Sequence, residues 1–246
     1  IRGSRQTGTN NDASFIYVDG VKVRGSSAVT QAATAEVKVF TGGIPAKYGD
    51  ASGGIISITT KGAAETTHGG LEILTSGFNV GETTIGFDKY NYNLLSANLT
   101  GPLIRIKDKS DPEGKKKRSI VGYFLATELN YSRDRDPSAN GMWKVKDDVL
   151  EELWANPVRR NPIGGTDLAA EFISNSQLEK VAAKQNTPIK GIVANANLDF
   201  VTTPNITLKV GGSVAYNVRN EFDFDRSLFN FDNNGQQIQN TWRVFG

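Results

Sequence analysis

The segment of residues 42–61 constrains the fold of this chain more than any other stretch. It reads GGIPAKYGDASGGIISITTK, with a Tyr48-Gly49 pair, a Gly53-Gly54 pair and then a run that is almost entirely β-branched. Paired glycines indicate a turn in which the backbone adopts positive φ angles or approaches another segment closely. β-Branched residues favour strands. The segment therefore predicts a tight turn that leads directly into a strand at residues 55–60.

A second pattern of this kind lies upstream. Residues 15–21 read FIYVDGV, in which Asp19-Gly20 stands between two valines. Asp-Gly in this setting favours a two-residue hairpin turn. We expect a short β-hairpin here, preceded by a polar stretch and, at the start of the chain, by Ile1-Arg2-Gly3.

Apolar and polar residues alternate in the rest of the chain, from residue 63 onward. The alternating segments are residues 69–75, 90–99, 121–131, 192–200, 206–217 and a sixth that begins near Ile238. In the third segment Phe124 is an apolar exception on the polar face, and the fourth places Asn195, Asn197 and Asp199 on its polar face. Such lengths are close to the ~9–11 residues with which a tilted strand crosses a bilayer. Period-two alternation alone fits a soluble β-sandwich equally well.

The lengths of the connections favour a membrane barrel. Long connections at residues 77–89, 132–190 and 218–237 fall at one end of the strands, and a tight turn at residues 202–205 falls at the other. Transmembrane barrels have long extracellular loops and short periplasmic turns. The exception is residues 100–119, a long connection at the end of the strands where short turns are expected. It ends in the basic run 115–118. That run either binds anionic lipid head groups or is a solvated turn at the membrane boundary, and the second is favoured.

The connection at residues 132–190 is too long for a structureless loop. Residues 147–154 read DDVLEELW, which predicts a helix with an acidic first turn and one apolar stripe. A second helix is expected from about Asp167 to Lys184. The two helices could cap the barrel mouth, bind a partner protein or pack on each other, and packing on each other is favoured.

Composition excludes several classes of function. The chain has no cysteine and one histidine, His68, which leaves no thiolate or multi-histidine metal site and no thiol nucleophile. A net charge of +2 argues against nucleic acid as a partner. We find no nucleophile elbow and no phosphate-binding glycine loop that opens a helix, so the chain is not expected to be an enzyme and no cofactor is expected. The carboxylates around Asp223, Asp225 and Asp232 could bind Ca²⁺, but their spacing differs from that of a calcium loop, and a solvated loop is favoured.

These motifs together resemble the TonB-dependent receptors of the bacterial outer membrane. In that family an IRG strand, a VDGV hairpin and a tyrosine-glycine turn followed by a GGVINITTK-type strand occur in this order. The resemblance implies a β fold: a fragment of a large plugged transmembrane antiparallel β-barrel with a small α/β plug domain. Residues 1–62 would be the C-terminal part of the plug. Residues 63–246 would be the first five or six barrel strands, with a partly helical extracellular insertion at about 132–190.

The resemblance also implies roles for individual residues. The plug-motif positions are expected to fix the geometry of the plug and not to bind substrate; they are Arg2, Gly3, Asp19, Gly20, Tyr48, Gly49, Gly53, Gly54 and Lys61. An apical plug loop would face the substrate, with Arg5, Gln6, Thr9, Asn10 and Asn11 as its candidate residues. No catalytic residue and no metal ligand is implied.

The implied function is import of a bound nutrient, either a glycan, a peptide or a metal chelate, with energy from the inner-membrane proton gradient. The partners would be outer-membrane lipid and the TonB complex, which would engage a segment expected before Ile1. Asparagine-rich strands are typical of receptors from Bacteroidota, many of which have a lipoprotein lid. Residues 42–54 depart from the motif of the lidded type, so a lid is an open question. One alternative is a receptor-like barrel that serves as a structural subunit of a larger outer-membrane assembly or secretion complex; another is a soluble β-sandwich binding module.

Overall fold

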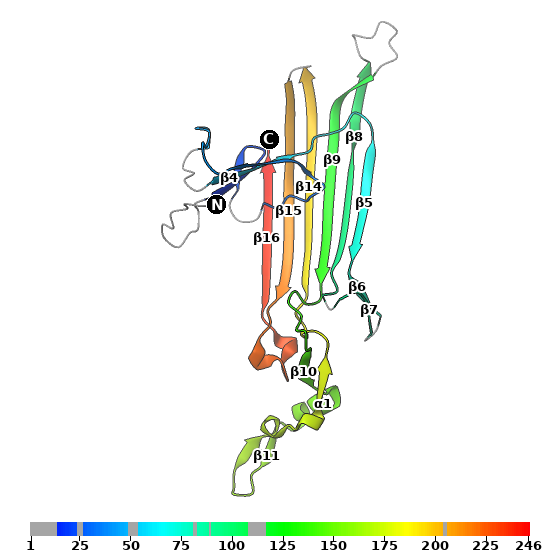
Figure 1. Cartoon of the computed structure of the whole chain (residues 1–246). Helices are drawn as coiled ribbons and strands as arrows, with labels where there is room; N and C mark the ends of the chain where they lie inside the picture. The colour runs from blue at the N-terminus through cyan, green and yellow to red at the C-terminus, as the bar shows by residue number, and fades with distance from the viewer. Residues whose placement is uncertain are drawn as a thin grey trace.

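Two sheets of very different size make up the body of the molecule (Figure 1). The structure is a computed structural model, and it describes residues 14–23, 27–48, 54–80, 83–88, 90–107, 117–203 and 206–246. We refer below to the large sheet and the small sheet. The predicted β fold class is confirmed.

The large sheet has six strands in the order β16-β15-β14-β9-β8-β5, and each pairs antiparallel with its neighbours. Its strands are β5 (His68–Thr75), β8 (Asn93–Lys107), β9 (Lys117–Ser132), β14 (Ile189–Thr203), β15 (Ile206–Asn220) and β16 (Gln236–Phe245). All six predicted alternating segments are strands. The order is an up-and-down meander, in which every strand lies beside the strand that precedes it in this sheet.

The predicted connection at residues 100–119 is wrong, because most of it is strand. β8 begins three residues later than expected and continues through Pro102 to Lys107. The register shifts after Pro102, as at a β-bulge or similar irregularity, where proline is tolerated within a strand. The connection shrinks to residues 108–116, which lie outside the described residues. β8 and β9 pair directly and no additional strand lies between them, so each later connection stays at the end of the sheet that was predicted for it.

All the long connections leave the large sheet at the same end (Figure 1). The first of them contains a hairpin, β6 (Gly77–Val80) with β7 (Thr83–Gly86). The last contains two short 3-10 turns, Phe224–Arg226 and Phe231–Asn233. At the opposite end of the sheet β8 and β14 finish and β9 and β15 begin.

The middle connection, residues 133–188, folds as an insertion that extends beyond the sheet (Figure 1). It contains α1 (Asp147–Ala155), an antiparallel pair of strands distant in sequence, β10 (Met142–Val145) with β13 (Leu178–Val181), and a short hairpin, β11 (Val158–Arg160) with β12 (Thr166–Leu168). The half-buried Lys144 of β10 links this strand to α1 and β13, because its Nζ atom lies 2.7 Å from Asp147 Oδ1 and 3.0 Å from Glu179 Oε1. Burial lowers the pKa of Lys144, but these two carboxylates outweigh burial and raise it above its ordinary value.

The first predicted helix of the insertion is confirmed, and the second is wrong. Between Asp167 and Lys184 the chain forms β12, a 3-10 turn at Ala169–Phe172, another at Asn175–Gln177 and then β13. At Ser174 and Gln177 the side chains and backbone bond each other in a reciprocal cap that closes a single short turn. Pairing of β13 with β10 then takes the remaining apolar residues into a strand. The expected packing between two helices therefore does not occur.

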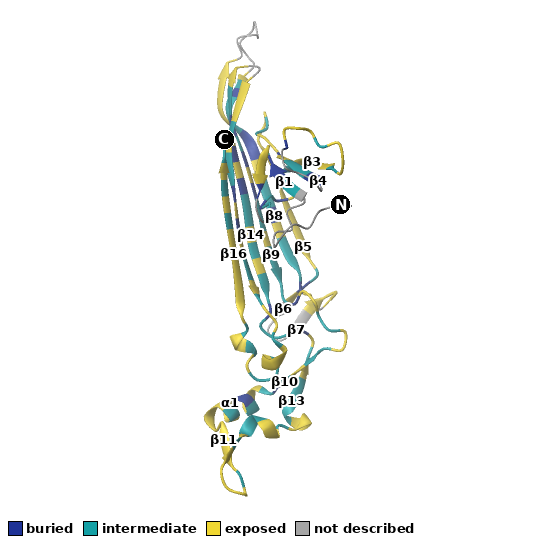
Figure 2. Ribbon diagram, turned by 90° about the vertical axis from the view of Figure 1, so that its left-hand side faces the viewer, coloured by how far each residue is buried: buried dark blue, intermediate teal, exposed yellow. Residues whose placement is uncertain are grey.

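The small sheet contains β1 (Ser14–Val18), β2 (Val21–Val23), β3 (Thr34–Phe40) and β4 (Gly54–Thr60), in the order β2-β1-β4-β3. β1 and β2 form the predicted hairpin, and β4 is the predicted strand, which lies parallel to β1. Tyr17, Tyr48 and Ile55 form the core of this sheet. In the part of the chain that the structure describes, residues 14–62 contain strands and turns and no helix. Figure 2 shows the small sheet against one face of the large sheet, which we call the inner face.

The opposite, outer face of the large sheet is apolar and exposed. Five consecutive rows of cross-strand neighbours on this face contain no charged residue. The central rows contain Leu71 and Trp242, which are 69% and 74% exposed, and Leu99, Leu125 and Val244. No helix within the described ranges is long and apolar enough to cross a membrane.

Candidate functional site

The interface between the small sheet and the inner face is the most elaborate polar contact in the described structure. Its first part is formed by Asn195 of β14, which is buried. The Asn195 amide donates a hydrogen bond to the Ala28 carbonyl at 2.8 Å and accepts one from the Thr30 N–H, also at 2.8 Å. One asparagine side chain thus satisfies two backbone groups of the segment 27–30, which has no sheet partner of its own.

The second part of the interface lies one step along the same strand, at the end of β4. Asn197 donates to the Lys61 carbonyl at 2.9 Å and to the Thr60 hydroxyl at 3.2 Å. Asp199 accepts from the Ala63 N–H at 2.6 Å, and Lys209 of β15 donates to the Thr60 carbonyl at 3.1 Å. The polar face of β14 that the sequence predicts is therefore the face that holds the small sheet.

Asp19 connects the hairpin turn of the small sheet to this second part. Its carboxylate accepts from the Thr60 N–H at 2.8 Å and from the Thr60 hydroxyl at 2.5 Å, and the same hydroxyl accepts from Asn197. Asp19 has a φ of 48°, a left-handed conformation that aspartate tolerates in turns. A continuous chain of hydrogen bonds therefore runs from the β1–β2 turn to the large sheet, which we also call the wall.

The other predicted motif residues are placed as follows. Tyr48 packs edge-on against Tyr17, with ring centroids 4.8 Å apart, and Gly54 begins β4 with a φ of 136°. Gly20 follows Asp19 in the hairpin turn, and the Lys61 N–H donates to the Ala33 carbonyl at 2.8 Å. The remaining predicted positions lie outside the described residues: Arg2, Gly3, Arg5, Gln6, Thr9, Asn10, Asn11, Gly49 and Gly53.

Phe124, the apolar exception in the alternation of β9, has a role in this interface. It packs with Ala126 and Ala33 in a fully buried cluster, against which Val29 and Ala32 also lie. Next to this cluster, Gly122 leaves room for Ala63: a Cβ atom at Gly122 would overlap the Ala63 methyl group. The wall is shaped to let the small sheet and the following segment approach closely.

The wall therefore holds the small sheet mainly by its backbone, through side chains that reach from β14 and β15. Typical hydrogen bonds of this kind contribute about 0.5–1.5 kcal/mol each. Among the described residues, three buried polar atoms on the inner face have no hydrogen-bond partner: Asp199 Oδ1 and Ser213 Oγ at this interface, and Asn130 Oδ1 farther along the sheet. A polar, incompletely satisfied contact of this kind stabilises a position and can be broken without exposing a large apolar core.

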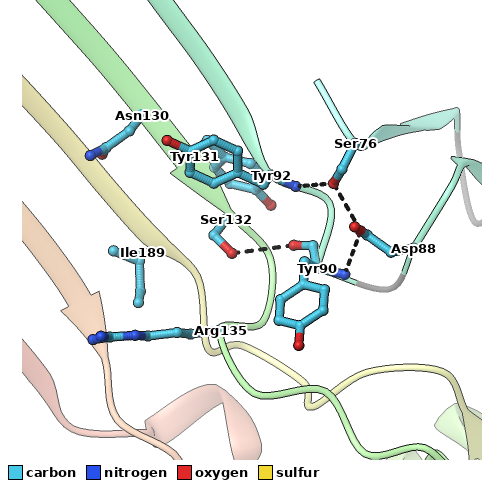
Figure 3. Close-up of a pocket in the computed structure, with 9 residues that line it drawn as sticks. All are labelled: Ser76, Asp88, Tyr90, Tyr92, Asn130, Tyr131, Ser132, Arg135 and Ile189. Carbon is cyan, nitrogen blue, oxygen red and sulfur yellow. Dashed lines mark hydrogen bonds between the residues drawn. The ribbon is translucent and has the colours of Figure 1, made fainter. Parts of the chain in front are cut away.

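A hollow of about 520 Å³ lies near the insertion end of the large sheet (Figure 3). We call it the tyrosine pocket; its lining is Ser76, Asp88, Tyr90, Tyr92, Asn130, Tyr131, Ser132, Arg135 and Ile189. Asn130, Ser132 and Ile189 occupy inner-face positions by their register, so the pocket and the small sheet share one side of the wall. Its volume is in the range of small-molecule sites.

A hydrogen-bond network fixes the aromatic side of the pocket (Figure 3). Asp88 Oδ1 accepts from the Ser76 hydroxyl at 2.8 Å and from the Tyr90 N–H at 3.0 Å. Ser76 in turn accepts from the Tyr92 N–H at 2.9 Å, and the Tyr90 carbonyl accepts from the Ser132 hydroxyl and the Arg133 N–H. The backbone that carries Tyr90 and Tyr92 is thus held on both sides, which preorganises the pocket.

Asp223, one of the carboxylates considered as a possible Ca²⁺ ligand, interacts with residues close to it in sequence. Asp223 accepts from the Asp225 N–H at 3.0 Å and forms an ion pair with Arg226 at 3.2 Å. In the described part of the chain, no group of three or more His, Cys, Asp or Glu residues could hold a metal ion.

Comparisons with known proteins give similarity in structure only. No protein-family model matches the chain, and no curated protein matches it in sequence. Its structure is similar to that of the siderophore receptor PirA from Acinetobacter baumannii, with a TM-score of 0.47, 17% identity, 85% of this chain covered and 24% of PirA. It is also similar to a G324V mutant of the ferric enterobactin receptor PfeA from Pseudomonas aeruginosa, with a TM-score of 0.48, 15% identity, 96% of this chain covered and 31% of PfeA. The chain spans less than a third of each receptor, and similarities this distant carry no argument about its function.

Proposed function

We propose that this chain is part of a TonB-dependent receptor that imports a ligand across the bacterial outer membrane. In this proposal residues 1–62 belong to a plug, and residues 63–246 supply the first strands of the barrel that encloses it. The observation that carries the proposal is the two-faced large sheet: its outer face is exposed and free of charge over five rows, while its inner face holds a second sheet.

The dimensions of the apolar band support a membrane environment. On β14 the five rows extend from Ile192 to Phe200, or about 26 Å along a strand that rises about 3.3 Å per residue. At a tilt of about 40° this corresponds to about 20 Å of membrane depth, close to the ~25 Å apolar band of outer-membrane barrels. Charged residues flank the band, with Lys190 beyond one end and Lys107 and Arg118 beyond the other. This agrees with the interpretation of the basic run as a boundary.

The interface between the sheets supports a plug that can move. A transported ligand needs a passage along the barrel, and a plug held by hydrogen bonds to its backbone can be displaced at modest cost. We further propose that an inner-membrane TonB complex supplies the force, and that the motif residues Asp19, Tyr48 and Lys61 maintain the geometry of the plug. A receptor of the Bacteroidota type, with or without a lipoprotein lid, fits the asparagine-rich strands.

A second candidate function is a structural subunit of an outer-membrane assembly. The insertion favours it, because residues 133–188 have two ordered strand pairs and a helix and extend clear of the wall as a docking surface would. Both candidates share the barrel. They differ in whether the plug must move.

The membrane assignment is tested by a pair of neighbouring substitutions on β5 in the complete protein. Leu71 lies on the outer face and Glu72 on the inner face, and both are exposed in the structure. If the outer face contacts lipid, Leu71→Arg costs about 2–4 kcal/mol near the middle of the bilayer, whereas Glu72→Arg faces the interior.

We expect the wild-type protein and Glu72→Arg to appear in the outer-membrane fraction and to migrate faster on gels when unheated, as folded barrels do. Leu71→Arg is expected to accumulate less and to lose the fast-migrating form. Equal behaviour of the two variants, with the protein in a soluble fraction, would overturn the proposal in favour of a soluble β module.

A further inference from the structure

We propose that the tyrosine pocket is a ligand site for small molecules that combine a ring with a carboxylate, and that Arg135 binds the carboxylate. This inference rests on the proposed receptor function and adds a class of substrate to it. Its evidence comes from the charges, the rings and the rigidity of the pocket.

The charge argument begins with the cations at this end of the sheet. Lys184 lies 3.7 Å from carboxylate oxygens of both Asp134 and Asp136, and Arg219 lies 3.7 Å from Glu221. The Arg135 guanidinium, by contrast, has no hydrogen bond and no ion pair among the residues that the structure describes. A guanidinium with its donors unused beside a pocket matches the paired oxygens of a carboxylate.

Arg135 is also held in place by its neighbours in sequence. Asp134, which is 2% exposed, accepts hydrogen bonds from the Asp136 N–H and the Lys184 N–H, each at 2.9 Å. The backbone on both sides of Arg135 is therefore anchored. In Figure 3 its side chain extends beside Ile189, on the side of the pocket away from Ser76 and Asp88.

The acidic residue of the pocket does not compete with a bound anion for Arg135. Asp88 Oδ1 accepts hydrogen bonds from Ser76, Tyr90 and Asn91, which hold this carboxylate on the side of the pocket that carries Tyr90. The pocket thus separates its charges: the hydrogen-bonded Asp88 carboxylate lies on one side and the Arg135 guanidinium, which forms no ion pair among the described residues, lies on the other. An anionic group can bind near Arg135 without displacing a protein carboxylate.

The rings define the rest of the ligand. Tyr90 is 46% exposed, and Tyr92 lies two residues away on the same anchored segment. Exposed tyrosine rings offer a flat apolar surface with a polar edge, which suits an aromatic ring or the apolar face of a sugar ring. Asn130 adds an amide to the wall of the pocket. Two kinds of small molecule that combine a ring and a carboxylate serve as test cases: peptides that end in an aromatic residue, and oligosaccharides of uronic acids.

The test measures binding by the complete protein in detergent, after the fast-migrating folded form has been verified for every variant. The probes are the N-acetylated tripeptide Gly-Gly-Phe with its C-terminal amide as neutral partner, and trigalacturonate with galactotriose as neutral partner. We expect at least one acidic probe to bind at least tenfold more tightly than its neutral partner, as loss of a charge-assisted hydrogen bond predicts. Whichever acid binds identifies the source of the carboxylate.

Three variants locate the binding. Arg135→Gln is expected to weaken binding of the acidic probe about tenfold or more and to leave the neutral partner unchanged, and Arg135→Lys is expected to fall between it and the wild type. Arg219→Gln removes the same charge from the same end of the sheet but outside the pocket, and is expected to change binding less than twofold.

Equal affinity of the acidic and neutral probes, an unchanged affinity in Arg135→Gln, or no binding of either acid at millimolar concentration would overturn the inference. Because the variants are first shown to be folded barrels, such results would leave the proposed receptor function standing. A protein that never appears as a folded membrane barrel would instead remove both.

Discussion

At the scale of the residue, Asn195 is the side chain on which the position of the small sheet depends most. It satisfies the Ala28 carbonyl and the Thr30 N–H, and both residues are buried, with Thr30 completely so. In Asn195→Ala both backbone groups lose their hydrogen bond to the amide at a buried site, and loss of a buried hydrogen bond costs about 1–3 kcal/mol. We expect this variant to assemble as a barrel and to show faster proteolysis of the small sheet.

Limited proteolysis followed by mass spectrometry measures this effect, and Asn98→Ala is the matched control. Asn98 occupies the same inner-face row on β8, and it makes no hydrogen bond to the small sheet among the described residues. Asn195→Asp is also informative, because it keeps the acceptor for Thr30 but places a carboxylate against the Ala28 carbonyl. Protection from proteolysis equal to wild type in Asn195→Ala would show that the small sheet is held elsewhere.

Single residues also mark the limit of what the sequence could predict. Alternation placed Asn195, Asn197 and Asp199 on one polar face, because period two is a local property of the chain. Their partners lie 130 or more residues away, at Ala28, Thr60 and Ala63, and no local pattern encodes such a pairing. Arg135 was missed for the same reason. Arg135 stands out only in the folded structure, where, among the described residues, Lys184 and Arg219 are paired with carboxylates and Arg135 is not.

At the scale of the element, the close approach of the segment after β4 to β9 depends on a glycine. A Cβ atom at Gly122 would overlap the Ala63 methyl group, and the backbone N–H of Ala63 donates a hydrogen bond to Asp199. Gly122→Ala is therefore expected to destabilise this contact by about 1–3 kcal/mol, as overpacking does. Faster amide hydrogen exchange in residues 60–67 is the measurement.

Gly70→Ala is the matched control for this prediction. It lies on the inner face of β5, and its added methyl group would meet only the flexible end of the Asn98 side chain, 3.1 Å away. We expect its exchange pattern to resemble that of the wild type. If both variants, or neither, speed exchange at residues 60–67, the contact between Gly122 and Ala63 does not position the small sheet.

The elements themselves were predicted from the sequence to different degrees. The six long strands were found because alternation persists over many residues, whereas their ends were misplaced where Pro102 coincides with a register shift. The helix α1 was found because its acidic first turn and apolar stripe agree. The second helix was wrong because its few apolar residues are used in pairing with β10, a tertiary interaction that overrides weak helical periodicity.

At the scale of the whole molecule, an importer and a structural subunit differ in one requirement: whether the small sheet must leave its place on the wall. Ala33 of the small sheet and Ala126 of the wall are fully buried in one cluster, and the chain has no cysteine of its own. We expect cysteines introduced at both positions in the complete protein to form a tether between the two sheets, and loss of free thiols on oxidation verifies that the disulfide has formed. A disulfide at this place resists separation far more strongly than hydrogen bonds do.

We expect the oxidised double variant to assemble normally and to lose ligand uptake by cells almost completely, and uptake is expected to return when a reducing agent opens the disulfide. The acidic probe bound by the purified protein serves as the ligand, so that binding and uptake are measured with the same molecule. Ala33→Cys alone and Ala126→Cys alone control for the substitutions, and both are expected to retain uptake. Unchanged uptake in the tethered protein would mean that the ligand passes without displacement of the small sheet. Absence of uptake in the wild type, together with normal assembly of the tethered form, would instead favour the structural subunit, because a structural subunit does not need the small sheet to move.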